Sequence, residues 1–257
     1  MTPAAASGTT NITNATSYNW TGYRLKGTDP NHIYYTSVAG NWSVPYFDPP
    51  NNSVQESASQ WVGIGSGDTG WDQLIQAGTV AYTGPGWNGI GPSGTYGFYE
   101  SYPLQSEVII QNLPVNSGDV AGASVSYIAR SNTMIWVVCS SSANNTCVSG
   151  TEALGSTVGT YAEQAEWIME RHSVNGLNTL LLPFVRADYY GATYKEWRGG
   201  STVSDTYILN QGPTGPGLTL DNIAMVDCGG TPTLASTGSL DSQGNFSTFS
   251  YHQGTAC

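Results

Sequence analysis

Short segments rich in β-branched and aromatic residues alternate with turn-forming residues along most of this chain. Glycine, proline, asparagine and aspartate separate the segments, as in the Ser-Gly-Asp turns at 66–68 and 117–119. Such spacing is typical of antiparallel sheets that form a sandwich or a barrel. The predicted strands are residues 33–38, 60–64, 74–82, 96–102, 107–111, 123–128, 134–139, 180–185, 206–209 and 246–251.

The pattern predicts an all-β fold with a single domain. Residues 1–17 are polar and are expected to form a flexible N-terminal arm, with the domain over residues 18–257. One segment, residues 160–172, does not fit, because it is rich in good helix formers. As a strand it would place Glu166 and Glu170 on one face and Trp167 on the other. The residues alone leave helix and strand open here.

Charge excludes some function classes. Only 10% of the 257 residues are charged, against roughly 25% in an ordinary soluble domain, and the formal net charge is −11. Seven Lys+Arg cannot form the basic face that binds nucleic acid. No apolar run approaches the roughly 20 residues that span a bilayer, so no membrane partner is expected. Because most carboxylates lack a cationic partner, we expect higher stability at about pH 3–4 than at about pH 8.

Four cysteines, an even number, indicate disulfides and therefore a secreted, extracellular protein. Cys139 and Cys147 bracket a short polar loop, which favours pairing them and leaves Cys228 with Cys257. Three connectivities remain open on sequence grounds. A zinc site would need tighter cysteine pairs or nearby histidines.

Other catalytic motifs are incomplete or absent in this sequence. Asp68-Thr69-Gly70 occurs once, whereas pepsin-like enzymes need two such carboxylates. The histidines at 32, 172 and 252 have no metal-ligand spacing and are interpreted as surface or structural. No metal and no cofactor are expected, and a monomer is the default.

Five segments occur in an order that resembles the glutamic peptidases, or eqolisins (peptidase family G1), over roughly residues 18–190. In that family the corresponding stretches are similar in residue type and order. The segments are Asn19-Trp20-Thr-Gly, Trp61-Val-Gly-Ile-Gly, Leu74-Ile75-Gln76-Ala-Gly78, Phe98-Tyr99-Glu100-Ser-Tyr102-Pro103 and Ala165-Glu166-Trp167-Ile168.

The resemblance implies a β-sandwich of two bent antiparallel sheets, with the segment around Glu166 as a strand. It also implies an acid-acting, pepstatin-insensitive endopeptidase that cleaves polypeptides. The family's catalytic glutamine falls on Gln76, its catalytic glutamate on Glu166 and its supporting carboxylate on Glu100. Supporting or substrate-binding roles are expected for the residues Trp61, Tyr99, Tyr102 and Glu170, although Glu170 also fits a surface charge.

The chain departs from the family pattern at several positions. Gly65 replaces an aspartate, Phe98 and Ser101 replace tryptophans, and Arg171 stands where an acid commonly follows Glu170. These differences point to a divergent, bacterial-type branch.

The glutamate and glutamine pair that the resemblance implies can work at acidic pH. A glutamate can take a proton from water and return it to the leaving amine, and a glutamine amide keeps its charge state at every pH. One alternative is a β-sandwich glycoside hydrolase that uses Glu100 and Glu166. Another is a carbohydrate-binding module without catalysis.

Overall fold

The strands of this protein form two main sheets in the computed structural model. The structure describes residues 12–27, 33–47, 53–66, 73–85, 93–155, 162–174, 176–198, 201–202, 206–210 and 218–256. Sheet I has the order β1-β18-β2-β11-β4-β5-β6-β7. Its strands are β1 Ile12–Ser17, β18 Leu218–Val226, β2 Trp20–Gly27, β11 Gln164–Glu170, β4 Glu56–Gly65, β5 Leu74–Thr83, β6 Gly94–Tyr102 and β7 Gln105–Pro114.

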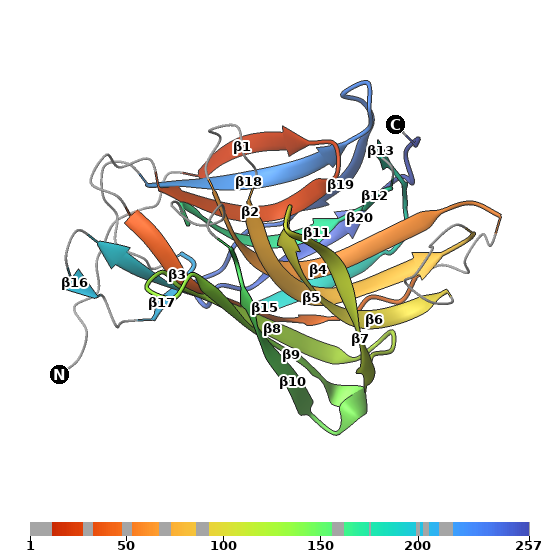
Figure 1. Ribbon diagram of the computed structural model, residues 1–257. Coiled ribbons are helices and arrows are strands. Elements are labelled where there is room, and N and C mark those ends of the chain that lie inside the picture. Colours follow the sequence, from red (N-terminus) through yellow and green to blue (C-terminus); the bar gives the residue numbers. More distant parts are fainter. Residues whose placement is uncertain are drawn as a thin grey trace.

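Sheet II has the order β10-β9-β8-β3-β15-β20-β19, and β19 also pairs with β18, which connects the two sheets. Its strands are β10 Thr146–Ala153, β9 Thr133–Ser140, β8 Val120–Ile128, β3 Ile33–Ser43, β15 Arg186–Arg198, β20 Phe246–Ser250 and β19 Thr233–Thr237. In Figure 1, β1, β18 and β2 lie at the top and β8, β9 and β10 at the bottom.

The remaining elements are short. They are β14 Leu180–Leu181, β16 Ser201–Thr202, β17 Tyr207–Ile208, the hairpin of β12 Ser173–Val174 and β13 Leu177–Asn178, and a 3₁₀ turn at Ser141–Ala143. Among the described pairs, β1–β18 and β14–β4 are parallel and the others are antiparallel. The predicted all-β sandwich is confirmed.

The main core lies between the sheets and uses alternate residues of each strand. Trp167 on β11 is fully buried there, and its indole nitrogen donates to the Ala39 carbonyl on β3 at 2.9 Å. Trp42 on β3 likewise donates to Thr79 on β5 at 2.8 Å. Because alternate residues of a strand point to opposite faces, the residues between these core positions face away from the core.

The segment with helix propensity is a strand. β11 pairs with β2 on one side and with β4 on the other over all of Gln164–Glu170. Two complete ladders and burial on both faces outweigh a local preference of a few tenths of a kcal/mol per residue.

The prediction for the N-terminal arm is wrong for residues 12–17, which form β1 and pair with β18. These residues are polar because one edge and much of the surface of β1 face solvent. Residues 1–11 lie outside the described part of the chain.

The Cys139–Cys147 disulfide is confirmed. It links paired positions of β9 and β10, with Cα atoms 4.0 Å apart. Cys228 is disulfide-bonded as well, while Cys257 lies outside the described residues, as do Asp68 and His32.

Candidate active site

Sheet I brings the predicted catalytic residues into one row on its face away from the main core. Glu100, Gln76, Gly63 and Glu166 are successive cross-strand partners on β6, β5, β4 and β11. Gln76 and Glu166 are therefore two strand spacings apart, about 10 Å between Cα atoms. Gly63 lies between them, and the side chains of Leu74 and Trp61 cover it.

The glycine at position 63 is required by packing as well. A Cβ there would lie 2.9 Å from both Leu74 Cδ1 and Trp61 Cζ3 and 3.1 Å from the Ile75 carbonyl oxygen. At Gly65, two residues along the same face, a Cβ would meet nothing closer than Glu166 Oε1 at 3.4 Å. Space therefore remains above Gly65, whereas Leu74 and Trp61 fill the space above Gly63.

A cleft of about 590 Å³ opens over this row. Gln76, Glu100 and Glu166 line it together with Glu170 and Tyr102. Gln76 is only 4% exposed and Glu166 only 1%, so both side chains are shielded from bulk water although they border the cleft. Polar groups in such a setting interact more strongly than they do in water.

Glu100 holds the Gln76 amide. Gln76 Nε2 donates to Glu100 Oε2 at 2.5 Å, whereas Gln76 Oε1 has no hydrogen-bond partner among the described residues. Burial raises the pKa of Glu100 above its ordinary value, and the bond from Gln76 offsets part of that rise. The amide therefore has a fixed orientation, with one N–H and the carbonyl oxygen left for other partners.

Glu170 is not a surface charge. Its carboxylate accepts from Trp61 Nε1 at 2.8 Å and from Asn19 Nδ2 at 3.0 Å. Burial, together with the nearby Glu100, raises its pKa to about 7, although hydrogen bonds from Trp20, Trp61 and Asn19 lower it. Trp61 acts here by binding Glu170, since its ring is fully buried.

Sequence reasoning missed a buried pair at this end of the cleft. His172, interpreted as surface or structural, lines the cleft, and its Nε2 lies 3.5 Å from Glu107 Oε2. Burial lowers the pKa of His172 to about 4 and raises that of Glu107 well above its ordinary value. Tyr82 donates to Glu107. The only available signal was the position of His172, two residues after Glu170.

The two tyrosines of the β6 motif point to opposite faces. Tyr102 lines the cleft, next to Leu74 on β5. Tyr99 instead stacks on Trp136 of sheet II, with ring centroids 4.2 Å apart. Tyr99, for which a supporting or substrate-binding role was expected, therefore does not line the cleft, because it is an odd number of residues from Glu100 along the strand and so points to the other face.

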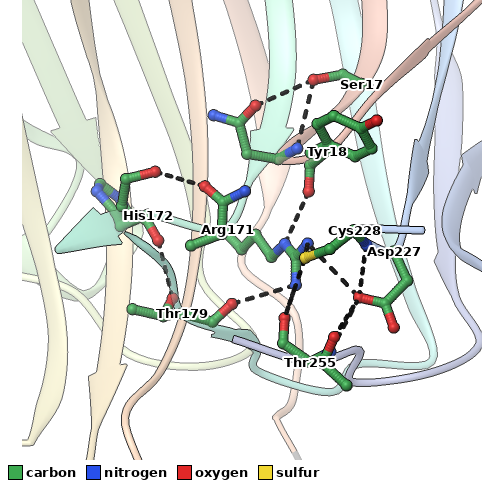
Figure 2. A network of polar contacts seen from close by, with 11 residues as sticks. Ser17, Tyr18, Arg171, His172, Thr179, Asp227, Cys228 and Thr255 are labelled. Carbon is green, nitrogen blue, oxygen red and sulfur yellow. Dashed lines mark hydrogen bonds and ion pairs between the residues drawn. The ribbon is translucent and has the colours of Figure 1, made fainter. Parts of the chain in front are cut away.

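Arg171 follows Glu170 and points away from the cleft, into a buried network (Figure 2). Its guanidinium donates to the carbonyls of Tyr18, Thr179 and Thr255 at 2.8, 3.3 and 3.0 Å. Asp227 lies 3.9 Å away. The arginine that departs from the family pattern therefore ties the N-terminal segment, the end of β11 and the C-terminal segment together.

Arg24 is a second residue that sequence reasoning missed. It extends the row across sheet I, since it is the cross-strand partner of Glu166 on β2 and also lines the cleft. Its Nη2 lies 2.8 Å from Asp221 Oδ2. Only the pairing of β2 with β11, which are far apart in sequence, places it there.

Neither a metal centre nor a transmembrane helix occurs in the part of the chain that the structure describes. Within those residues, no three histidine, cysteine, aspartate or glutamate side chains gather as a metal site would require. The same residues include no helix whose length and hydrophobicity would suit a membrane span.

Comparisons with known proteins agree with this geometry. A family model described as Peptidase A4 family matches residues 18–224. A crystal structure of scytalido-glutamic peptidase with a transition state analog inhibitor has a TM-score of 0.68 at 16% identity, and the match covers 91% of this chain and 99% of that one. The structure of SCP-B, a member of the eqolisin family in complex with the tripeptide Ala-Ile-His, has a TM-score of 0.56 at 17% identity with the same coverage.

No curated protein sequence gives a match. The two structural matches establish the shared fold, and the family model extends over most of the chain, including all five motifs. The resemblance to glutamic peptidases is confirmed, and the glycoside hydrolase and carbohydrate-binding alternatives are not supported. This chain belongs to the peptidase A4 family and is a peptidase that acts on polypeptides.

Proposed function

We propose that the protein is an acid-acting, pepstatin-insensitive glutamic endopeptidase in which Glu166 activates water and Gln76 stabilises the oxyanion. The observation that carries this proposal is the row Gln76–Gly63–Glu166, which brings an amide and a carboxylate to one face of sheet I, where both line the same cleft. A peptide carbonyl and a water molecule would occupy the part of the cleft that Gln76, Gly65 and Glu166 line.

The reaction needs only these groups. Ionised Glu166 takes a proton from water as the oxygen attacks the peptide carbonyl carbon. The carbonyl oxygen gains the negative charge and accepts a hydrogen bond from Gln76 Nε2, an interaction worth roughly 3–4 kcal/mol in comparable oxyanion sites. Protonated Glu166 then donates to the amide nitrogen, the C–N bond breaks, and an acid and an amine leave.

Glu100 supports this assignment by its contact with Gln76. The hydrogen bond of 2.5 Å holds the amide before substrate arrives, so less reorganisation is needed in the transition state. The remaining N–H of Gln76 is the donor for the oxyanion.

We also propose that the protein is secreted and acts as a monomer. The Cys139–Cys147 disulfide supports secretion, because such bonds persist in oxidising compartments.

The test is proteolysis of casein between about pH 2 and 7, with and without pepstatin, by the parent, Gln76→Ala and Glu166→Gln. We expect pepstatin-resistant activity in acid that falls by at least about 100-fold in both variants. Circular dichroism would check that each variant is folded. Full activity in folded Gln76→Ala would refute the mechanism, and inhibition by pepstatin would refute the stated insensitivity.

A further inference from the structure

Arg24 is the only lysine or arginine among the described residues that line the cleft. It lies opposite Glu166 on the neighbouring strand, in direct register. Side chains of such cross-strand partners start from Cβ atoms about 4.5–5.5 Å apart on the same face of a sheet. Arg24 and Glu166, the base of the proposed mechanism, therefore share one face of sheet I on neighbouring strands.

The guanidinium is held in place from its far side. Arg24 Nη2 and Nε donate to Asp221 Oδ2 at 2.8 and 3.2 Å, and Thr13 donates to the other oxygen at 2.6 Å. Lys26 Nζ lies 3.1 Å from the same Asp221 oxygen. Two cations thus share one carboxylate, so Asp221 anchors Arg24 without cancelling all of the positive charge near Glu166.

We propose that Arg24 is a positioning residue that keeps Glu166 ionised in acid. The proposal rests on the proposed function, in which Glu166 is the general base. Burial in general disfavours the ionised form of a carboxyl group, and a general base is active only when ionised. A neighbouring guanidinium stays protonated across the acid range and opposes that effect.

Other charged groups lie on this face as well. Among the residues that the structure describes they are Glu100 from β6, Glu170 from the strand of Glu166, Lys26 from β2 and Asp221 from β18; β4 and β5 contribute uncharged Gly63 and Gln76. Glu100 and Glu170 have raised pKa values and are largely neutral at acidic pH. The positive charge of Arg24 is then not opposed by these two neighbours.

The experiment measures kcat/KM against pH with a peptide substrate for the parent and Arg24→Met. The acid limb of this profile reports the base of the free enzyme. We expect the acid limb of Arg24→Met to move to higher pH by about one unit. At pH values below the limb its kcat/KM should be about tenfold lower than that of the parent, and on the plateau at higher pH it should change little. Arg24→Lys should restore the parental limb, because it restores the charge.

Asp221→Asn provides a test with the opposite sign. Removing the carboxylate leaves both cations unopposed, so the acid limb should move to lower pH. A purely structural defect would not move the two limbs in opposite directions. Arg186→Met is the matched control, since Arg186 is exposed on β15 of sheet II and pairs with Asp188; its limb should stay unchanged.

The outcomes separate this inference from the proposed function. If Glu166→Gln keeps full activity, the mechanism itself fails. If Glu166→Gln is inactive but the limbs of folded Arg24→Met and Asp221→Asn both match the parent, the role of Arg24 is refuted. A rise in KM at every pH without a limb shift would also refute it, because Arg24 would then be binding substrate. If Arg24→Met does not fold, the direction of the Asp221→Asn shift decides.

Discussion

Gly63 separates Gln76 from Glu166 in the row across sheet I. This glycine is enclosed by Leu74, Trp61 and the backbone of β5. A packing constraint therefore acts at the centre of the row that the proposed mechanism uses.

Gly63→Ala should reduce kcat/KM strongly, by about tenfold or more, because its methyl group would displace the Leu74 and Trp61 side chains, and with them the strands that position the amide and the carboxylate. Contacts at 2.9 Å with Leu74 and Trp61 also predict a loss of about 1–3 kcal/mol of unfolding free energy. Kinetics on casein fragments and thermal unfolding measure the two effects.

Gly65→Ala is the matched control on the same strand and face. The methyl group would meet only ordinary contacts there, the nearest at 3.4 Å, so stability should change by less than about 1 kcal/mol. Equal losses of stability in the two variants would contradict the packing argument for Gly63.

At the scale of elements, β11 shows how one strand serves both the core and the cleft. Trp167 fills the space between the sheets, Glu166 and Glu170 face the cleft, and Arg171 ends the strand in a buried network. The strand is central in sheet I, so both its edges are paired, and every side chain has a fixed direction.

Arg171→Met should lower the unfolding free energy by roughly 3–5 kcal/mol, because three backbone carbonyls and Asp227 lose a buried cationic partner. The C-terminal segment around Thr255 should become the most affected region. Hydrogen exchange measured on the variant and the parent would detect this: the exchange rate should increase more at residues 251–256 than in β4 or β5. Unchanged exchange there would show that Arg171 does not hold the segment.

For the whole molecule, charge and burial together predict how stability depends on pH. Glu100, Glu107 and Glu170 all have pKa values raised by burial, so between pH 4.5 and about 7 the folded protein binds more protons than the unfolded chain. Stability therefore falls as pH rises through this range. His172 acts in the opposite direction between about pH 4 and 6.5, but it is one group against three.

Glu170→Gln should weaken this dependence. A shift of the Glu170 pKa from 4.5 to about 7 corresponds to roughly 3 kcal/mol of stability lost between those pH values. The variant should show a smaller drop in Tm between about pH 4.5 and 7.5 than the parent. Glu152→Gln, on edge strand β10 of sheet II, is the control and should keep the parental slope. A parental slope in Glu170→Gln would contradict the assigned cause.

The sequence predicted β9, where burial alternates residue by residue, and also β5, which is rich in β-branched and apolar residues and is buried throughout. It missed β15 because the alternation changes phase at a bulge between Tyr190 and Thr193, where Gly191 has a φ of 60°. A pattern that shifts by one residue in the middle of a strand hides the period of two.

By itself the sequence predicted the all-β class, favoured the Cys139–Cys147 pairing and singled out Gln76, Glu100 and Glu166, because turn signals, cysteine spacing and ordered motifs are local properties. Only the tertiary structure decided that Arg24 lies beside Glu166, that Tyr99 leaves the cleft and that His172 is buried. These facts depend on the register between strands that are distant along the chain. Register is fixed by the packing of the two sheets as a whole.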